Sequence, residues 1–278
     1  MIDSIVALSK KLIAIKTDPH NRPALEEALA VVEKELQGFT IEKFERNGYK
    51  SILAYHAKTR PEQFKIILNG HLDIIPGKDH QYIPRIERDK LYGVGALDMK
   101  SNLSCLIHVF KEMAPKVSYP LGIQIVTEEE LGGFDGTKYQ IEEGVRADFV
   151  ISSETTNLNI VNKAKGIMWV KIATKGVTAH GAYPWRGENA VWKMHEFLDV
   201  LKKKHPDPPD QQWVTTVNLS SIQTSNKTFN KIPDDCEVCL DIRFIPEDAK
   251  TIADDIKSLL PQDFTIEYIT NEPALDVD

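Results

Sequence analysis

The segment Phe64–Leu68 limits the possible folds of this chain most, because four of its five residues are apolar. A strand with successive apolar residues is typical of a sheet that is covered on both faces. Apolar residues at helical spacing precede this segment, and short apolar runs alternate with helical patterns after it. We expect helices at 3–15, 23–37, 100–114 and 134–142, and strands at 40–46, 51–56, 65–70, 121–126 and 148–152. This alternation predicts an α/β domain with an at least partly parallel sheet.

A second pattern begins near Lys165. The expected order is a strand at 167–175, a helix at 188–203, strands at 213–223 and 235–245, a helix at 247–260 and a strand at 263–270. This is the βαββαβ order of a ferredoxin-like unit, and about 105 residues is a typical size for a small domain. The chain of 278 residues is long enough for two domains. We expect them at 1–164 and 165–272, followed by an exposed connector at 273–278.

The charge and the cysteine content exclude several classes of protein. With 41 acidic and 34 basic residues the net charge is −7, which does not suit a protein that binds nucleic acid through clustered Lys and Arg. Cys236 and Cys239 lie within a strand-like run that lacks the turn a zinc or redox pair needs, and Cys105 makes the count odd. We expect structural thiols in a reducing compartment, the cytoplasm. The N-terminal apolar segment is interrupted by Lys10 and Lys11 and is too short to span a membrane.

Four clusters of acidic or histidine residues lie in the first domain, most of them directly after apolar strands. They are Asn69–Asp73 with His71 and Asp73, Gly93–Lys100 with Asp98, Thr127–Gly133 with Glu128, Glu129 and Glu130, and Ser152–Thr155 with Glu154. In open α/β sheets, binding sites form outside the carboxyl ends of the strands. One histidine and several carboxylates at such positions suit zinc, with manganese or cobalt as alternatives.

Three of these clusters also have a simpler explanation. His71 could be a surface histidine beside a turn, Asp98 could be a helix N-cap, and the three glutamates could form a solvated loop. The glycines of Gly93–Lys100 could also suggest a phosphate loop. The dinucleotide fingerprint needs a third glycine, however, and an aspartate at the mouth of the helix repels phosphate. A nucleotide-binding α/β protein is therefore disfavoured.

The ordered motifs GHLD, GxGxxDMK, TEEELGG and SET resemble those of the zinc-dependent deacylase and exopeptidase family. This family includes acetylornithine deacetylase, succinyl-diaminopimelate desuccinylase, aminoacylase, carnosinase-type dipeptidases and glutamate carboxypeptidase. The resemblance spans essentially the whole chain. It implies a zinc-exopeptidase-like three-layer α/β/α catalytic domain, with the ferredoxin-like unit inserted as a lid and dimerisation domain. The activity it implies is hydrolysis of an amide bond in N-acyl amino acids or small peptides by a metal-activated water.

The resemblance also implies a set of metal ligands. His71, Asp98 and Glu154 would bind one zinc ion, and Asp98 and Glu130 would bind a second. The peptide bond between Asp98 and Met99 would be cis.

Further residues are implied to act in catalysis or substrate binding. Asp73 would orient the metal-binding histidine, and Glu129 would be the general base that takes a proton from the attacking water. In a homodimer formed through the lid, His180 would reach the partner's site and stabilise the oxyanion. Asn230 would contact the substrate, and Arg243 would hold its free carboxylate. The simpler explanations are a surface histidine at position 180 and a strand-edge salt bridge at position 243.

The sequence departs from the family after the lid. Members usually return to the catalytic domain there, complete its sheet and supply one more histidine ligand, whereas this sequence stops at Asp278. His195 and His205 belong to the lid helix and its end, so both are poor substitutes. We therefore expect an incomplete catalytic domain, a weakened second metal site, low or absent hydrolysis by this chain alone, and exposed apolar surface. The alternative function is a catalytically silent metal-binding and dimerisation fragment.

Overall fold

The computed structural model describes residues 1–277. The chain divides into two compact units, an N-terminal unit, Met1–Leu158, and a C-terminal unit, Asn159–Asp278. The short strand β8 (Lys163–Ala164) pairs with β13 (Leu275–Asp276), so the segments that enter and leave the C-terminal unit lie side by side. This pairing explains why the division falls before residue 164, the last residue of the predicted first domain.

The N-terminal unit is built on a five-stranded sheet with the order β1-β2-β6-β3-β7. The strands β6, β3 and β7 are parallel, whereas β1 and β2 are antiparallel to their neighbours. The sheet is therefore partly parallel, as the alternating sequence pattern predicts. Its strands are β1 (Thr40–Arg46), β2 (Tyr49–Tyr55), β3 (Phe64–His71), β6 (Leu121–Val126) and β7 (Ala147–Ser152), and a separate ribbon pairs β4 (Arg85–Glu87) with β5 (Lys90–Tyr92).

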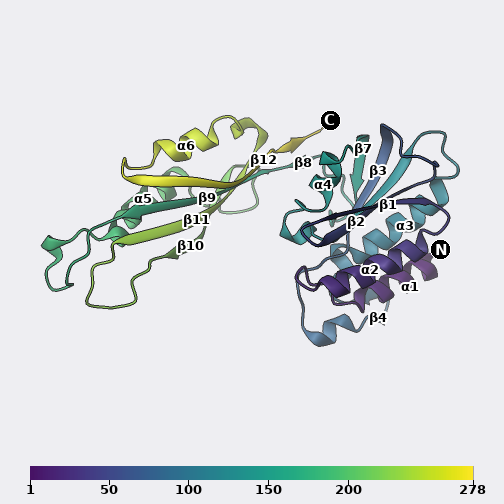
Figure 1. Ribbon diagram of the computed structural model, residues 1–278, viewed down its shortest axis with the longest axis horizontal. Coiled ribbons are helices and arrows are strands. Elements are labelled where there is room, and N and C mark those ends of the chain that lie inside the picture. The colour runs from purple at the N-terminus through teal and green to yellow at the C-terminus, as the bar shows by residue number, and fades with distance from the viewer. Residues whose placement is uncertain (278) are drawn as a thin grey trace. The chain divides into compact units, whose positions relative to one another are not determined.

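Helices cover the two faces of this sheet unequally. On one face lie α1 (Ile2–Ile13), α2 (Arg22–Glu35) and α3 (Ser101–Met113), and their apolar stripes form the larger core with the sheet (Figure 1). The other face carries α4 (Thr137–Glu142) over a smaller core that includes Phe64 and Tyr139. The burial of both faces explains the nearly continuous apolar run in β3.

The edge strand β7 is covered on neither face. Phe149 and Val150 are 54% and 55% exposed and Ile151 is 40% exposed, although successive side chains of a strand point to opposite faces. Exposed apolar surface was expected for this domain, and β7 carries part of it.

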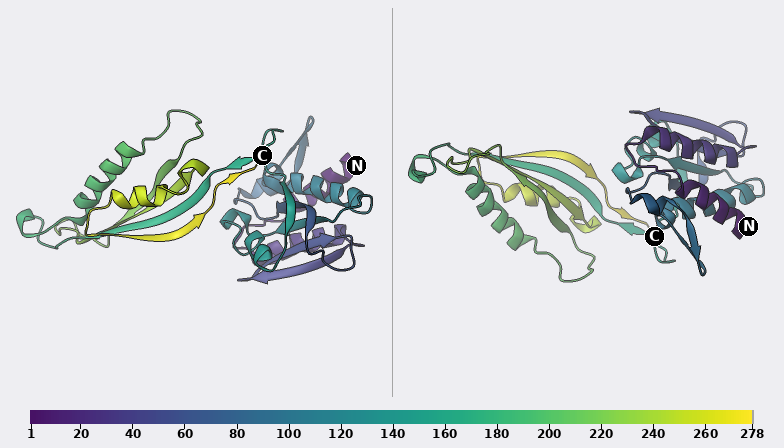
Figure 2. Two further views of the ribbon diagram at one scale, coloured as in Figure 1. Left: turned by 90° about the horizontal axis from the view of Figure 1, so that it is seen from above. Right: turned by 90° about the horizontal axis from the view of Figure 1, so that it is seen from below.

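The C-terminal unit contains a four-stranded antiparallel sheet with the order β10-β11-β9-β12. Buried and less buried residues alternate along β9 and β11, so only one face is packed. Helices α5 and α6 lie together on that face (Figure 2). The expected βαββαβ order is confirmed by β9 (Gly166–Lys175), α5 (Ala190–Lys204), β10 (Thr216–Gln223), β11 (Asp235–Phe244), α6 (Ile252–Ser258) and β12 (Phe264–Glu272).

The cysteines are free thiols: Cys236 is buried on β11, Cys239 lies half-buried three residues further along that strand, and Cys105 is exposed on α3. An odd spacing along a strand places Cys236 and Cys239 on opposite faces, so they cannot act as a pair. Among the described residues, no helix has the length and apolar character needed to cross a bilayer.

Candidate metal centre

Three of the four sequence motifs meet at one edge of the N-terminal sheet. His71, the last residue of β3, is in register with Val126 at the end of β6, and Asn69 is in register with Ser152 at the end of β7. Because parallel strands end at the same edge, the residues that follow them converge there.

The second motif reaches the same place through an irregular turn. Gly95 adopts φ +72°, a conformation that favours glycine, and the following residues Ala96–Lys100 bend into the start of α3. The Asp98–Met99 peptide is cis, as the family resemblance implies. Thr155 of the fourth motif donates a hydrogen bond to the carbonyl of Leu97 at 3.0 Å, which joins these two motifs.

One ring nitrogen of His71 faces a group of carboxylates. His71 Nε2 lies 3.2 Å from Asp98 Oδ1, 3.6 Å from Glu154 Oε1 and 3.7 Å from Glu129 Oε2. One potential ligand atom from each of His71, Asp98 and Glu154 lies within 4.8 Å of the others. These are the three residues expected to bind the first metal ion, and theirs is the only group of this kind among residues 1–277.

The other ring nitrogen of His71 faces Asp73. Nδ1 donates to the Asp73 carbonyl oxygen at 3.0 Å and lies 3.4 Å from Asp73 Oδ1. A carbonyl can only accept, so the proton of a neutral ring lies on Nδ1 and the lone pair on Nε2 faces the carboxylates. The Asp73 carboxylate is itself held by the backbone N–H of Glu130, which donates to Oδ2 at 2.8 Å.

The three consecutive glutamates have different environments. Glu128 is buried and its Oε2 accepts a hydrogen bond from the Asp135 backbone N–H at 2.8 Å. Its side chain therefore holds the loop between residues 128 and 135. Glu129 is exposed beside His71. Glu130 Oε1 accepts from the Ile75 backbone at 3.2 Å, and Glu130 is absent from the group of residues that could share a metal ion.

Crowding of carboxylates changes the proton affinity of the centre. Burial lowers the pKa of His71, but the hydrogen bond and charge of Asp73 and the charges of Glu129 and Glu154 raise it to about 9. Burial raises the pKa of Glu154 to about 7, with the Asp98 and Glu129 charges adding to the shift and His71 opposing it. Burial also raises the pKa values of Glu129 and Glu130. Excess negative charge around a histidine lone pair is suited to a cation.

Two residues without a predicted role lie beside this centre. Lys100 is fully buried, and burial lowers the pKa of its amine to about 7 against the opposing charge of Asp73. Thr17 is also fully buried and bonds to the Leu72 carbonyl. Lys100 belongs to the second motif, which could have drawn attention to it, but no sequence signal marks Thr17.

The predicted lid residues form one cluster and one separate position. His180 and Asn230 lie in neighbouring loops, where the Gly181 N–H donates to the Asn230 carbonyl at 2.7 Å. Both side chains belong to exposed residues. Arg243 lies near the far end of β11, where its Nε donates to Asp241 Oδ1 at 2.8 Å. A strand rises about 3.3 Å per residue, so roughly 25 Å separates Arg243 from the start of β11, the end nearer Asn230.

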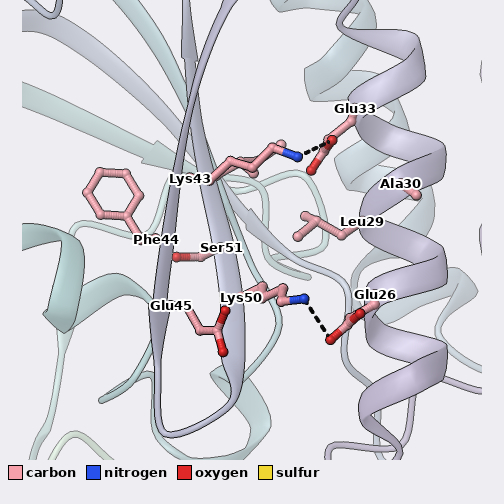
Figure 3. A pocket seen from close by; sticks show the side chains of 10 residues that line it. Glu26, Leu29, Ala30, Glu33, Lys43, Phe44, Glu45, Lys50 and Ser51 are labelled. Carbon is pink, nitrogen blue, oxygen red and sulfur yellow. Dashed lines mark hydrogen bonds and ion pairs between the residues drawn. The ribbon is translucent and has the colours of Figure 1, made fainter.

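A cavity of about 410 Å³ lies away from the metal-ligand cluster, between α2 and the hairpin of β1 and β2 (Figure 3). Lys43 pairs with Glu33 at 2.6 Å and Lys50 with Glu26 at 2.9 Å across it, with Leu29 between the two ion pairs. None of the predicted site residues lines this cavity.

Comparison with known proteins relates the chain to metal-dependent hydrolases. Residues 162–264 match the family described as the peptidase dimerisation domain. The chain is 26% identical over 267 residues to a succinyl-diaminopimelate desuccinylase of Xylella fastidiosa, covering 87% of this chain and 70% of that protein. It is 31% identical over 195 residues to an acetylornithine deacetylase of Pectobacterium carotovorum, covering 65% of this chain and 50% of that protein. Both of these relatives are named as enzymes that remove an acyl group from an amino acid derivative.

A solved structure supports the same relationship at the level of the fold. An M20 family metallo-carboxypeptidase from Sulfolobus solfataricus superposes with a TM-score of 0.76 at 15% identity, covering 98% of this chain and 79% of that one. The fold class predicted from the motifs is thereby confirmed. The family resemblance and the type of enzyme are supported by the matched dimerisation domain and by the relatives named as a desuccinylase and a deacetylase. That neighbour is named as a metallo-carboxypeptidase, and the cluster of His71, Asp98 and Glu154 is a possible metal site in this chain.

Proposed function

We propose that the cluster around His71 is the catalytic metal centre of a hydrolase that cleaves amide bonds in N-acyl amino acids or small peptides. The observation that carries this proposal is the grouping of the His71 lone pair with Asp98 and Glu154, with Glu129 beside them. Mixed nitrogen and oxygen ligands favour zinc, and cobalt or manganese can occupy similar sites. The substrate class follows from the M20 homologues that are named as a desuccinylase and a deacetylase.

Glu129 and Asp73 would have different roles in the hydrolysis. A bound metal ion supplies Lewis acidity, which polarises the scissile carbonyl and lowers the pKa of water. Glu129, whose pKa is raised by burial, takes a proton from the attacking water and delivers it to the leaving amine. Asp73 holds His71 in the tautomer that offers Nε2 as a ligand.

A second ion, as expected from the family, would have fewer ligands in this chain. Asp98 and Glu130 are the proposed ligands, but the described residues contain no second group of three potential ligands. The alternative function is that this chain by itself is a silent metal-binding and dimerisation fragment. We expect weak binding of the second ion and low hydrolysis by this chain alone.

We further propose that the substrate is bound between two subunits. His180 and Asn230 lie at the opposite end of the sheet from Arg243, and a small substrate cannot contact both ends of one lid. In a homodimer formed through the peptidase dimerisation domain, His180 and Asn230 of one chain could serve the site of the other. Arg243 would then bind the free carboxylate of the substrate, in exchange for its contact with Asp241.

Metal content measured by elemental analysis of dialysed protein tests the proposal. We expect about one zinc ion per chain, because only one of the two proposed sites has three protein ligands. This ion should be lost in His71→Ala and retained in Glu130→Ala and in a control variant, His195→Ala, on the exposed face of α5.

Hydrolysis of N-succinyl and N-acetyl amino acids by the same preparations separates the two candidate functions. Turnover that depends on His71 and Glu129 supports the enzyme, and zinc binding without turnover supports the silent fragment. Absence of zinc from the wild-type protein would overturn the metal centre itself.

A further inference from the structure

One short segment of the N-terminal unit is bonded to both halves of the candidate metal centre. It comprises the C-terminal end of α1 and the turn that follows, residues 12–17. Lys100 Nζ donates to the carbonyl oxygens of Leu12 and Ile15, each at 2.9 Å. Thr17 Oγ1 donates to the Leu72 carbonyl at 2.6 Å, and the Ile74 N–H donates to the Thr17 carbonyl at 3.1 Å.

The position of these bonds links the segment to the proposed ligands. Leu72 and Ile74 are the two neighbours of Asp73, so Thr17 fixes the backbone on both sides of that residue. The Asp73 carbonyl in turn accepts from His71 Nδ1 at 3.0 Å. A shift of the backbone at residues 72–74 would therefore rotate the His71 ring and displace Nε2 from the carboxylates that it faces.

Lys100 makes the corresponding connection to the second motif. It lies two residues after Asp98, and its fully buried side chain extends to the Leu12 carbonyl in the last turn of α1 and to the Ile15 carbonyl just beyond that helix. These carbonyls also accept from the backbone N–H groups of Ile15 and Thr17, at 3.2 and 3.0 Å, and each has a second lone pair that the lysine can use. Burying an amine is costly unless its hydrogen bonds are made, so the two bonds hold Lys100 and the adjoining backbone in place.

We propose that Thr17 and Lys100 are positioning residues of the metal centre, and that residues 12–17 hold the His71–Asp73 and Asp98 motifs at a fixed separation. This inference rests on the proposed function, because it requires that His71, Asp98 and Glu154 bind a metal ion. The hydrogen bonds of both side chains go to backbone carbonyls. Both act through the backbone that presents the ligands.

A role in folding alone is the competing explanation, and matched variants distinguish it. Thr17→Val removes the hydroxyl at nearly constant volume, whereas Thr17→Ser keeps it. Ser9→Ala is the control, because Ser9 is also buried in this region and donates to a carbonyl within α1, that of Ile5 at 2.8 Å. Thr17→Val replaces the hydroxyl with a methyl group that faces the Leu72 carbonyl. Thr17→Ala is therefore a second test variant, because it removes the hydroxyl without adding that methyl group.

The experiment is a Co²⁺ titration of the metal-free full chain, followed by its visible absorption spectrum, with the thermal midpoint of each metal-free variant measured in parallel. Loss of a residue that orients a metal ligand typically costs 10–100-fold in affinity, so we expect Thr17→Val and Thr17→Ala to bind Co²⁺ about tenfold or more weakly. Their absorption bands should shift as the ligand geometry changes. Lys100→Met should also weaken Co²⁺ binding. Thr17→Ser should keep the Co²⁺ affinity and the spectrum of the wild-type protein.

The possible outcomes are separable. Equal losses of thermal midpoint in Thr17→Val and Ser9→Ala, with unchanged Co²⁺ affinity and spectrum in both, would overturn the positioning role and leave the metal centre intact. A wild-type protein that binds no Co²⁺ would overturn the proposed metal centre, and the positioning role with it.

Discussion

His71 illustrates how a single side chain is prepared for a cation by its surroundings. Its Nδ1 is held by the Asp73 carbonyl, and its Nε2 faces Asp98, Glu154 and Glu129 at 3.2 to 3.7 Å. Without a metal ion, protons compensate the crowded carboxylates, which is why the pKa of His71 is raised to about 9 and that of Glu154 to about 7. Metal binding must displace these protons, so affinity should rise with pH across this range.

The protonation of Glu154 gives a prediction for the stability of the metal-free protein. Its folded pKa of about 7 exceeds the ordinary value of 4.5, so between these pH values the folded state holds a proton that the unfolded state has lost. Glu154 therefore makes the free energy of unfolding fall as pH rises from about 4.5 to 7. Glu154→Gln should remove this fall, measured by urea denaturation at pH 5 and pH 7 in the presence of a chelator.

The control for this measurement is Glu62→Gln, at an exposed position of the same unit. It should keep the wild-type difference between the two pH values. His71 changes the free energy of unfolding at higher pH values. Its raised pKa stabilises the folded state fully below about pH 6.5, and this contribution is lost as the pH rises towards 9. If Glu154→Gln shows the same difference in the free energy of unfolding between pH 5 and pH 7 as Glu62→Gln, the pKa of Glu154 is not raised in the folded protein.

At the scale of elements, the ends of helices depend on single residues. The helix expected at 188–203 begins at Ala190, because the side chain of Asn189 accepts hydrogen bonds from the N–H groups of Val191 and Trp192 at 2.9 and 3.3 Å. The helix expected at 247–260 is shorter: a 3-10 turn at Pro246–Asp248 precedes α6, which spans Ile252–Ser258.

The N-cap of α5 gives a second prediction. Asn189→Ala should destabilise the C-terminal unit by about 1 kcal/mol, because two N–H groups lose their acceptor. Asn189→Ser keeps an acceptor and should lose much less. Asn21→Asp provides a comparison in α2, because it keeps the acceptor for the Ala24 N–H at 3.4 Å and loses only the bond that Asn21 donates to the Lys16 carbonyl at 3.3 Å, so its effect should be smaller than that of Asn189→Ala. Urea denaturation followed by circular dichroism measures all three, and equal losses in Asn189→Ala and Asn189→Ser would contradict the capping role.

At the scale of the whole molecule, the edge strand β10 is the surface through which we expect two lids to associate. It is the outermost strand of its sheet, and Leu219 and Ile222 are 43% and 51% exposed. Beside it, a cavity of about 370 Å³ is lined by residues of β10 and of the C-terminal half of α5. The proposed homodimer rests on the match of residues 162–264 to the peptidase dimerisation domain, and this edge belongs to that unit.

The two edges of the lid allow a matched test of this dimer. Ile222→Asp on β10 should shift the protein from dimer to monomer in sedimentation velocity, because the unpaired edge would have to bury a charge. Ile269→Asp on the opposite edge strand β12 changes a residue of nearly equal exposure, 52%, and should leave the dimer intact. Dissociation by the β12 variant alone would place the interface on the other edge.

The sequence by itself determined the two-unit pattern, the order of the elements and the four motifs, because helical and strand periodicities and strand-end residues are local signals. It also indicated His71, Asp98 and Glu154, which the structure brings together at one sheet edge. Only the tertiary structure decided which of the three adjacent glutamates turns inward, since Glu128 bonds to a later loop.

The contacts of Thr17 and Lys100 also depend on the tertiary structure. Thr17 bonds to a carbonyl 55 residues away, and Lys100 to carbonyls 85 and 88 residues away. No periodicity encodes such pairs, because their distance is set by how α1 and α3 pack against the sheet. The same packing buries Lys100, which its sequence neighbours alone would place at the exposed start of a helix.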